Sequence, residues 1–571
     1  MVSRTFIKLI LYLIFALLVF VCSVYFFYKR RVIASDFKSI VSKSSIINYI
    51  YDLRSLNVER WSLILILIVG IFFRLWQLAT WVPVYIDEAT WGLWGEIIQR
   101  SFALDDFRWL LLTTRMAGKP PLVAILFALS FDIFGVNLFA IRVVSAFASV
   151  LSILFVYKLG RTLFGTKVGL ISALMHSIIP YDVFFSRLAF QDSVVSSLIT
   201  GSILCYTYGF KRNNDLSTLL GGVLFGFAID AKPLGLKIAI ILFFYLLLTK
   251  NIRNNLKKTS IWMSFILTTI IYYPFLYYSA VRRFGPSTHY LTWGGSSETP
   301  TSEISSSMFS RLLNMPTILY DQFSWMLSMF TISAFILVFI GIGTLFLRKK
   351  KIELLPLIWI STELLTEWIP YTHRAAYILS IVPPACLVAG VGITLILDKF
   401  DEILIDTRIH MKIPSSVISL SLIALCFSYT AFFSCAMIFN PRETLPEGFR
   451  MVIDGRFSGI GWEETLEYLQ QENYPADTVI FPMPKQGFEF IAKSRNVYPR
   501  IFGVGYIRDY FNGAEFSKYL IEDNTCLFLI RRYNPVHYQD FDALVEIFPE
   551  ITLVKIIEVY GIPEVYIFIK P

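Results

Sequence analysis

Residues 140–159 read AIRVVSAFASVLSILFVYKL, a run in which only Arg142 and Lys158 carry a charge. An α-helix rises 1.5 Å per residue, so about 20 apolar residues cover the roughly 30 Å hydrocarbon core of a bilayer. Comparable apolar runs recur from the start of the chain to about Phe439. The sequence therefore predicts a polytopic α-helical membrane protein with about twelve spans.

The composition excludes an ordinary soluble protein. The 571 residues are 56% hydrophobic and only 16% charged, whereas soluble domains carry about 25% charged residues. The formal net charge is +9, but Lys and Arg cluster in short segments between apolar runs, as in loops retained in the cytoplasm. This pattern indicates membrane orientation and no nucleic-acid partner. The six cysteines show neither metal-ligand spacing nor a disulfide framework.

Three basic loops set the predicted orientation. They lie at 250–258, 348–351 and 399–412, and we place all three in the cytoplasm. The apolar runs between them then alternate in direction, which puts the loop 281–322 and the segment after Phe439 outside. The predicted location is the plasma membrane, with a multi-pass chain whose active site and C-terminal domain are extracytoplasmic.

The first apolar run covers residues 6–28 and is followed by three basic residues, Lys29 to Arg31. A signal peptide carries its charge before the apolar run and small residues after it. We therefore expect an uncleaved anchor, followed by a cytoplasmic linker.

One apolar run does not fit the alternation. Residues 120–137 begin outside, after an acidic loop, and must also end outside if residues 140–159 enter the membrane there. The run begins with Pro120 and Pro121 and is short for a span. We expect it to lie in the interface or re-enter; the alternative is a full span here and an error elsewhere in the topology.

Three domains are predicted. Residues 1–60 form the anchor helix and cytoplasmic linker. Residues 61–439 form the membrane-embedded domain, with a first outer loop at 80–118. Residues 440–571 are more polar and form a small extracytoplasmic α/β domain.

The C-terminal domain shows both helical and extended patterns. Residues 462–473, WEETLEYLQQEN, predict an amphipathic helix. Short apolar runs at 478–481, 526–530 and 551–557 predict strands.

An acidic pair, Asp87 and Glu88, follows the second apolar run in the stretch WVPVYIDEATWGLWGE. Two carboxylates at a membrane boundary are costly unless they are solvated or paired. They mark either a solvated loop or helix N-terminus, or a site in which a carboxylate acts as a general base on an acceptor hydroxyl or amine.

Several positive residues are predicted near the outer boundary. Lys119, in RMAGKPPL, is either a snorkelling lysine or a cation for a lipid phosphate. Arg187 and Asp192, in SRLAFQD, form either an internal ion pair or part of a site. Positive residues on this side run against the positive-inside trend and indicate an anionic ligand; the others are Lys232, His373 and Arg374.

Taken in order, a set of motifs resembles the C-type, multispanning glycosyltransferases, above all the protein O-mannosyltransferase and aminoarabinose transferase branch. The motifs are YIDEATWG at 85–92, GKPPL at 118–122, FGVNLFAIRVVSA at 134–146, YKLGRTLFG at 157–165 and SRLAFQD at 186–192, with weaker support from GFAIDAKPLG at 226–235 and HRAAYILSIVPP at 373–384. The match covers roughly residues 60–240; beyond that it extends to architecture only.

The resemblance implies an inverting transfer of a sugar from a polyprenyl- or dolichyl-phosphate carrier to an extracytoplasmic protein, lipid or glycan, in contact with membrane lipids. It maps the acceptor base to Asp87, a donor-phosphate contact to Lys119 and a second organising carboxylate to Asp192. We place Glu88 in the catalytic set beside Asp87. Further donor-phosphate contacts are expected from Arg187, Lys232, His373 and Arg374.

Two departures limit the resemblance. Some relatives have an acidic residue before the lysine of the KPP motif, where this chain has Gly118. A divalent metal is therefore possible but not indicated. The WWDYG motif of oligosaccharyltransferases is missing from the sequence, which argues against transfer of a whole oligosaccharide to asparagine.

Two other classes of function stay open from the sequence: a transporter or flippase of lipid-linked sugars, and a scaffold whose tail binds a partner. The transporter class favours inverted repeats and broken helices near the midplane, which the sequence does not show. A transferase further requires the Asp87 and Asp192 carboxylates to face one cavity, within about 10 Å of each other.

Overall fold

The computed structural model describes residues 45–103, 120–249, 252–281, 314–348, 350–366, 374–406, 415–453, 458–472, 479–483, 485–495, 500–501, 526–531, 552–559 and 562–570. Packing divides these residues into two units, and each is described by itself. The helical unit comprises the described residues of Met1–Trp76, Leu111–Leu122 and Ser145–Asn440. The α/β unit comprises those of Gln77–Leu110, Val123–Val144 and Pro441–Pro571.

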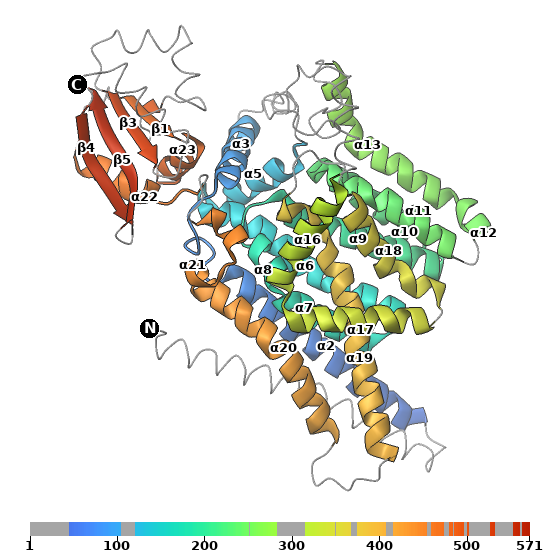
Figure 1. The fold of residues 1–571 in the computed structure, drawn as a ribbon. Coiled ribbons are helices and arrows are strands. Elements are labelled where there is room, and N and C mark those ends of the chain that lie inside the picture. The colour runs from blue at the N-terminus through green and yellow to red at the C-terminus, as the bar shows by residue number, and fades with distance from the viewer. Residues whose placement is uncertain are drawn as a thin grey trace. The chain divides into compact units, whose positions relative to one another are not determined.

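Helices make up the helical unit (Figure 1). They are α2 (Ser45–Leu75), α6 (Leu138–Phe164, whose first turns belong to the α/β unit), α7 (Thr166–Ile178), α8 (Pro180–Ser186), α9 (Gln191–Arg212), α10 (Asp215–Ala231), η1 (Pro233–Leu236), α11 (Lys237–Leu248), α12 (Ile252–Leu256), α13 (Thr259–Val281), α16 (Met315–Phe330), α17 (Ile332–Arg348), η2 (Lys351–Leu354), α18 (Leu355–Thr366), η3 (Ala375–Ile381), α19 (Val382–Asp406) and α20 (Ser415–Phe439).

Small residues allow the helices to pack closely. A Cβ atom added to Gly222 of α10 would lie 2.3 Å from the carbonyl oxygen of Ser264 in α13. One added to Gly341 of α17 would lie 2.0 Å from the carbonyl oxygen of Val388 in α19. Only glycine permits backbones to approach this closely, and such contacts are typical of helix packing in membranes.

The α7–α8 pair is bent by 57° at Ile179 and Pro180. A proline disfavours the helical conformation of the residue before it, and Ile179 is extended, with φ −68° and ψ 124°. Pro180 occupies the first position of α8, where its missing N–H costs no helical hydrogen bond. The break therefore follows from the sequence.

By length and composition, three helices among the described residues can cross a membrane, or up to five if each of two bent helix pairs counts as one crossing. The three are Leu138–Phe164, Gln191–Arg212 and Ala375–Phe400. The predicted anchor 6–28 lies outside the described residues, and several predicted spans are shorter helices. The total of about twelve spans therefore stays a prediction.

Contacts within the helical unit sort its helix ends into two sets. The ends predicted to be cytoplasmic meet one another through Arg161–Glu59 at 2.8 Å, Lys167–Asp398 at 2.7 Å and Lys258–Asn213 at 2.7 Å. The ends predicted to be outside meet one another as described for the candidate site. The grouping agrees with the predicted alternation; which set faces outside stays a prediction.

The α/β unit combines helices with one mixed sheet (Figure 1). Its helices are α3 (Ile86–Ala103), α5 (Leu122–Phe134, from Val123 on), α21 (Pro441–Thr444), η4 (Glu447–Val452), α22 (Trp462–Gln471) and α23 (Lys485–Ser494). Its strands are β1 (Val479–Met483), β2 (Arg500–Ile501), β3 (Cys526–Arg531), β4 (Thr552–Val559) and β5 (Ile562–Lys570), in the order β2-β1-β3-β5-β4. β1 is parallel to β2 and β3, whereas β5 is antiparallel to β3 and β4.

The predicted elements of the C-terminal segment are confirmed. The expected helix at 462–473 is α22, and the expected strands are β1, β3 and β4. β5 was not predicted, because Pro563 interrupts its apolar alternation and proline disfavours a strand interior.

Part of the predicted first outer loop, 80–118, is helical, and its location outside the membrane stays a prediction. Residues 86–103 of this segment form the helix α3. Its acidic residues lie in the first turn, and Ala89, Trp91 and Leu93 are buried, which covers more than one side of the helix. The charged and aromatic composition suggested a loop, but packing within the α/β unit stabilises a helix.

We expect Val136→Cys to react with an impermeant thiol reagent added from the outside. The helix α5 has 13 residues, about 20 Å in length at 1.5 Å per residue, which is too short for the roughly 30 Å core. Lys257→Cys, in a predicted cytoplasmic loop, is the matched control and should react only after permeabilisation. Labelling of Val136→Cys from the cytoplasm alone would overturn the topology.

Candidate active site

Asp192 and Lys232 meet at the ends of two helices of the helical unit. Lys232 Nζ lies 2.6 Å from Asp192 Oδ1, and both residues are buried. Asp192 is in the first turn of α9, where the helix dipole favours a carboxylate. Lys232 ends α10 in an extended conformation, with φ −164° and ψ 136°, because Pro233 follows it.

The turn after Lys232 depends on Gly235. A Cβ atom there would lie 2.5 Å from the carbonyl carbon of Ala228 and 2.6 Å from the backbone nitrogen of Ile229. Glycine lets η1 fold back against α10, so the motif AKPLG holds the lysine in a fixed place.

Tyr377 links this pair to a second one. Lys232 Nζ lies 3.9 Å from the centroid of the Tyr377 ring, a cation–π contact. Lys237 Nζ lies 3.5 Å from the backbone oxygen of Tyr377 and 2.6 Å from Glu363 Oε2. Glu363 also accepts hydrogen bonds from Ser380 Oγ at 2.6 Å and Trp359 Nε1 at 3.1 Å. One ion pair thus contacts the ring of Tyr377 in η3, and the other contacts its backbone oxygen.

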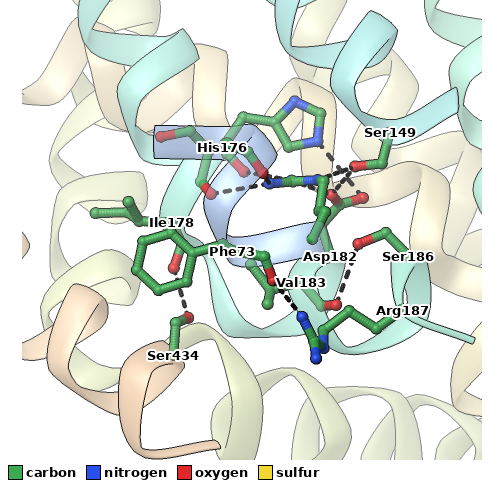
Figure 2. Close-up of polar contacts among 12 residues, drawn as sticks. Phe73, Ser149, His176, Ile178, Asp182, Val183, Ser186, Arg187 and Ser434 are labelled. Atoms are coloured by element: carbon green, nitrogen blue, oxygen red, sulfur yellow. Dashed lines mark hydrogen bonds and ion pairs between the residues drawn. The ribbon is translucent and has the colours of Figure 1, made fainter. Parts of the chain in front are cut away.

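Arg187, expected to bind donor phosphate, is fully buried. Its Nη1 donates to the carbonyl of Phe73 at 2.9 Å, as Figure 2 shows, and its Nη2 donates to Trp76 at 2.6 Å. These carbonyls end α2, where helix acceptors lack intrahelical partners. The arginine therefore caps α2. The alternative of an internal ion pair expected a structural contact of this kind, but its partners here are backbone carbonyls.

A buried network surrounds the break between α7 and α8. Arg74 Nη2 lies 2.5 Å from Asp182 Oδ2, and Arg74 Nε donates to Ser149 Oγ at 2.6 Å. Ser149 Oγ donates to Asp182, and His176 Nε2 lies 3.5 Å from the other carboxylate oxygen (Figure 2). Arg74 also binds the carbonyls of His176 and Ser177 at 3.1 and 3.0 Å. This network ties the end of α2 to the segment that leads to Asp192.

The acidic pair belongs to the α/β unit, and its two members differ. Asp87 is half-buried in the first turn of α3. Glu88 is fully buried and forms two 2.9 Å contacts with Arg142, one from each carboxylate oxygen. Glu88 Oε2 also accepts a hydrogen bond from the backbone N–H of Tyr85 at 2.9 Å. The oxygens of Glu88 are thus engaged in fixing the start of α3, and the catalytic roles expected of Glu88 and Asp87 stay predictions.

The remaining expected residues are partly outside the described part of the chain. Lys119 and His373 lie outside it. Arg374 is exposed and stands immediately before η3, which carries Tyr377. Asp87 and Asp192 belong to different units, so their predicted separation of about 10 Å stays a prediction. Within the described ranges, no group of three or more His, Cys, Asp and Glu residues could hold a metal ion.

Comparison with known proteins places the fold. Residues 118–278 match the family described as dolichyl-phosphate-mannose-protein mannosyltransferase. The structure of ArnT from Cupriavidus metallidurans bound to undecaprenyl phosphate is similar, with a TM-score of 0.56 and 13% identity over 88% of this chain and 97% of that chain. The apo oligosaccharyltransferase of Archaeoglobus fulgidus gives a TM-score of 0.53 and 13% identity over 83% and 69%. No curated protein matches the sequence.

The family match over residues 118–278 and the similarity of the fold to ArnT both agree with the C-type glycosyltransferase resemblance. The resemblance found in the sequence is thereby confirmed, as is the expectation of a glycosyltransferase. The segment that matches the family contains Lys119, Asp192 and Lys232, whereas Asp87 precedes it.

Sequence reasoning missed Tyr377, Lys237 and Glu363. Glu363 stands inside the apolar stretch LLPLIWISTELLTEWI, and an ionisable residue within a membrane segment is a functional candidate by default. That signal was available for Glu363. It was also available for Lys237, which lies five residues after Lys232 at the start of an apolar stretch. No sequence signal distinguishes Tyr377 from the many other tyrosines.

Proposed function

We propose that this glycosyltransferase moves a sugar from a polyprenyl- or dolichyl-phosphate carrier to an acceptor on the extracytoplasmic side of the membrane. The observation that carries the proposal is the Asp192–Lys232–Tyr377 group, in which a lysine is held at the start of α9 inside the segment that matches the mannosyltransferase family. ArnT has been determined with undecaprenyl phosphate and the archaeal oligosaccharyltransferase with dolichol-phosphate. Both carriers have the chemistry expected of the donor here.

The residues divide the reaction between two roles. The acceptor hydroxyl or amine attacks the anomeric carbon, and the Asp87 carboxylate takes its proton. The bond between the anomeric carbon and the phosphate oxygen breaks, and the lipid phosphate leaves with the electron pair. Lys119 and Lys232 stabilise that anion in a site of lowered dielectric. A single displacement of this kind inverts the anomeric centre.

Lys232 needs its neighbours for this role. A buried ammonium is costly unless it is paired, and Asp192 supplies the partner at 2.6 Å. The Tyr377 ring faces the same ammonium, and Lys237 and Glu363 fix the backbone that carries the ring. Arg374 is exposed and immediately precedes η3, so it adds positive charge near the N-terminus of that helix. The group therefore offers a fixed cation for a phosphate.

Lys119→Ala is expected to raise the Michaelis constant for the donor, with a smaller effect on the acceptor. The reason is that a lysine at headgroup depth contacts the donor phosphate as a point charge. The measurement is steady-state transfer with each substrate varied in turn. Lys211→Ala, whose amine contacts a backbone carbonyl at the ends predicted to be cytoplasmic, is the control. An unchanged donor Michaelis constant together with an unchanged turnover number would refute the role of Lys119.

The purified chain in lipid vesicles, supplied with radiolabelled polyprenyl-phosphate hexoses and pentoses, tests the whole proposal. Peptides with serine and threonine, and a glycolipid, serve as acceptors. Transfer predicts label in the acceptor and release of lipid phosphate. Movement of intact donor between leaflets without a new product would instead establish a transporter.

A further inference from the structure

The segment before Asp87 is buried inside the α/β unit. Trp81, Val82, Val84 and Tyr85 are at most 6% exposed. Buried backbone groups need hydrogen-bond partners, because water cannot reach them. The backbone path from residue 81 into α3 therefore depends on the segments that pack against residues 81–85.

Residues 458 and 459 provide that packing. Tyr85 forms an antiparallel β-bridge with Ser458. A Cβ atom added to Gly459 would lie 2.6 Å from the carbonyl oxygen of Val84 and 3.4 Å from its nitrogen. It would also lie 2.6 Å from Val84 Cγ1, but the backbone contact cannot be relieved by side-chain rotation, so only glycine fits. Ser458 and Gly459 of the C-terminal domain thus pack directly against Val84 and Tyr85, just before Asp87.

The helix α23 holds α3 itself. A Cβ atom added to Gly92 would lie 2.5 Å from Cε2 of Phe490. One turn further along the same face of α3, Glu96 Oε2 lies 2.9 Å from Lys493 Nζ. Apolar contact and ion pair together fasten α3 to the C-terminal domain at two successive turns.

We propose that the C-terminal α/β domain is a positioning element of the transfer reaction, which holds residues 84–96 so that Asp87 is presented in one orientation. The inference rests on the proposed function, in which Asp87 is the base. Misplacing a reacting group by about 1 Å costs on the order of 10²-fold in rate. A group on a helix supported by packed neighbours keeps its orientation better than one on a loop. Gly459, Phe490 and Lys493 are then positioning residues, which act through α3.

Gly459→Ala tests the proposal, with Gly448→Ala as its matched control. A Cβ atom on Gly448 meets nothing within 4 Å, and Gly448 lies in the same unit. Two quantities are measured on the full chain: amide hydrogen exchange across residues 84–92, and kcat and KM for the labelled donor. Gly459→Ala should speed exchange and lower kcat, each by at least about tenfold, with the donor KM within about twofold of wild type. Gly448→Ala should match wild type.

A second pair of variants covers the case in which Gly459→Ala does not fold. Alanine favours a helix interior more than glycine, so any loss in Gly92→Ala comes from the new contact with Phe490. Phe490→Leu removes the ring atoms that the new Cβ would meet. We expect Gly92→Ala to lower kcat, and Gly92→Ala combined with Phe490→Leu to restore at least about half of it.

The outcomes separate the inference from the proposed function. Faster exchange with an unchanged kcat, or no change in either, overturns the positioning role. If the wild-type chain transfers no sugar, the proposed function fails; unchanged exchange in Gly459→Ala would then show that the domain does not hold the segment at all.

Discussion

Asp87→Asn is expected to lower the transfer rate by at least about 100-fold, because loss of a general base removes a contribution of 10²–10⁴. Asparagine has almost the same size and tolerates the start of a helix, so folding and expression should be preserved. Asp87 is half-buried in the first turn of α3, whereas its neighbour Glu88 is engaged by Arg142. The measurement is kcat for transfer from a labelled lipid-phosphate sugar.

Asp132→Asn is the matched control for this variant. Asp132 is an exposed aspartate of the same unit and accepts a hydrogen bond from Gln99 at 2.8 Å. Its replacement should leave kcat within about twofold of wild type, because a surface substitution of this kind has little effect on structure. Retention of more than about a tenth of the rate in Asp87→Asn would exclude the role of a base.

Arg142→Met is expected to lower the free energy of unfolding by about 3–5 kcal/mol, since it leaves a buried carboxylate without its partner. Arg142 and Glu88 are both fully buried, and the arginine also binds the carbonyls of Leu78 and Pro83 at 3.0 and 3.1 Å. The measurement is the fraction of monodisperse protein in detergent after heating. The loss should appear as a lower midpoint temperature.

Two comparisons make this prediction specific. Arg100→Met breaks the contact with Glu96 at 2.5 Å, in which the arginine is 62% exposed, and should cost less than about 1 kcal/mol. Combining Arg142→Met with Glu88→Gln should regain part of the stability, because the buried charge is gone. Equal effects of Arg142→Met and Arg100→Met would show that burial of the Glu88 pair does not matter.

The helices, and the position of Asp192 and Lys232 at helix ends, were accessible from the sequence. Apolar runs such as 140–159 predict helices because burial in a membrane or core depends on the local spacing of apolar residues. Asp192 and Lys232 were expected at helix ends because each stands beside an apolar run, and Pro233 marks the end of α10. The amphipathic helix and three strands of the C-terminal domain followed from their periods of apolar residues.

The partners of the charged residues were decided by the tertiary structure alone. Glu88 pairs with Arg142 across 54 positions, and Lys237 pairs with Glu363 across 126. Arg187 donates to the carbonyls of Phe73 and Trp76 at the end of α2, which the sequence did not indicate. A charge that stands at a helix end can reach any neighbouring helix, and the sequence does not state which one packs there.

The sequence by itself determined the class of the protein: a chain with several apolar helices of membrane length, an acidic pair, a KPP lysine and a C-terminal α/β segment, because hydropathy and local motifs depend on residues close together in the chain. The tertiary structure decided that Glu88 pairs with Arg142, that Lys232 is held by Asp192, and that α23 packs on α3. These depend on contacts between distant segments, where the desolvation cost of a buried charge is met only by the partner that the packing supplies.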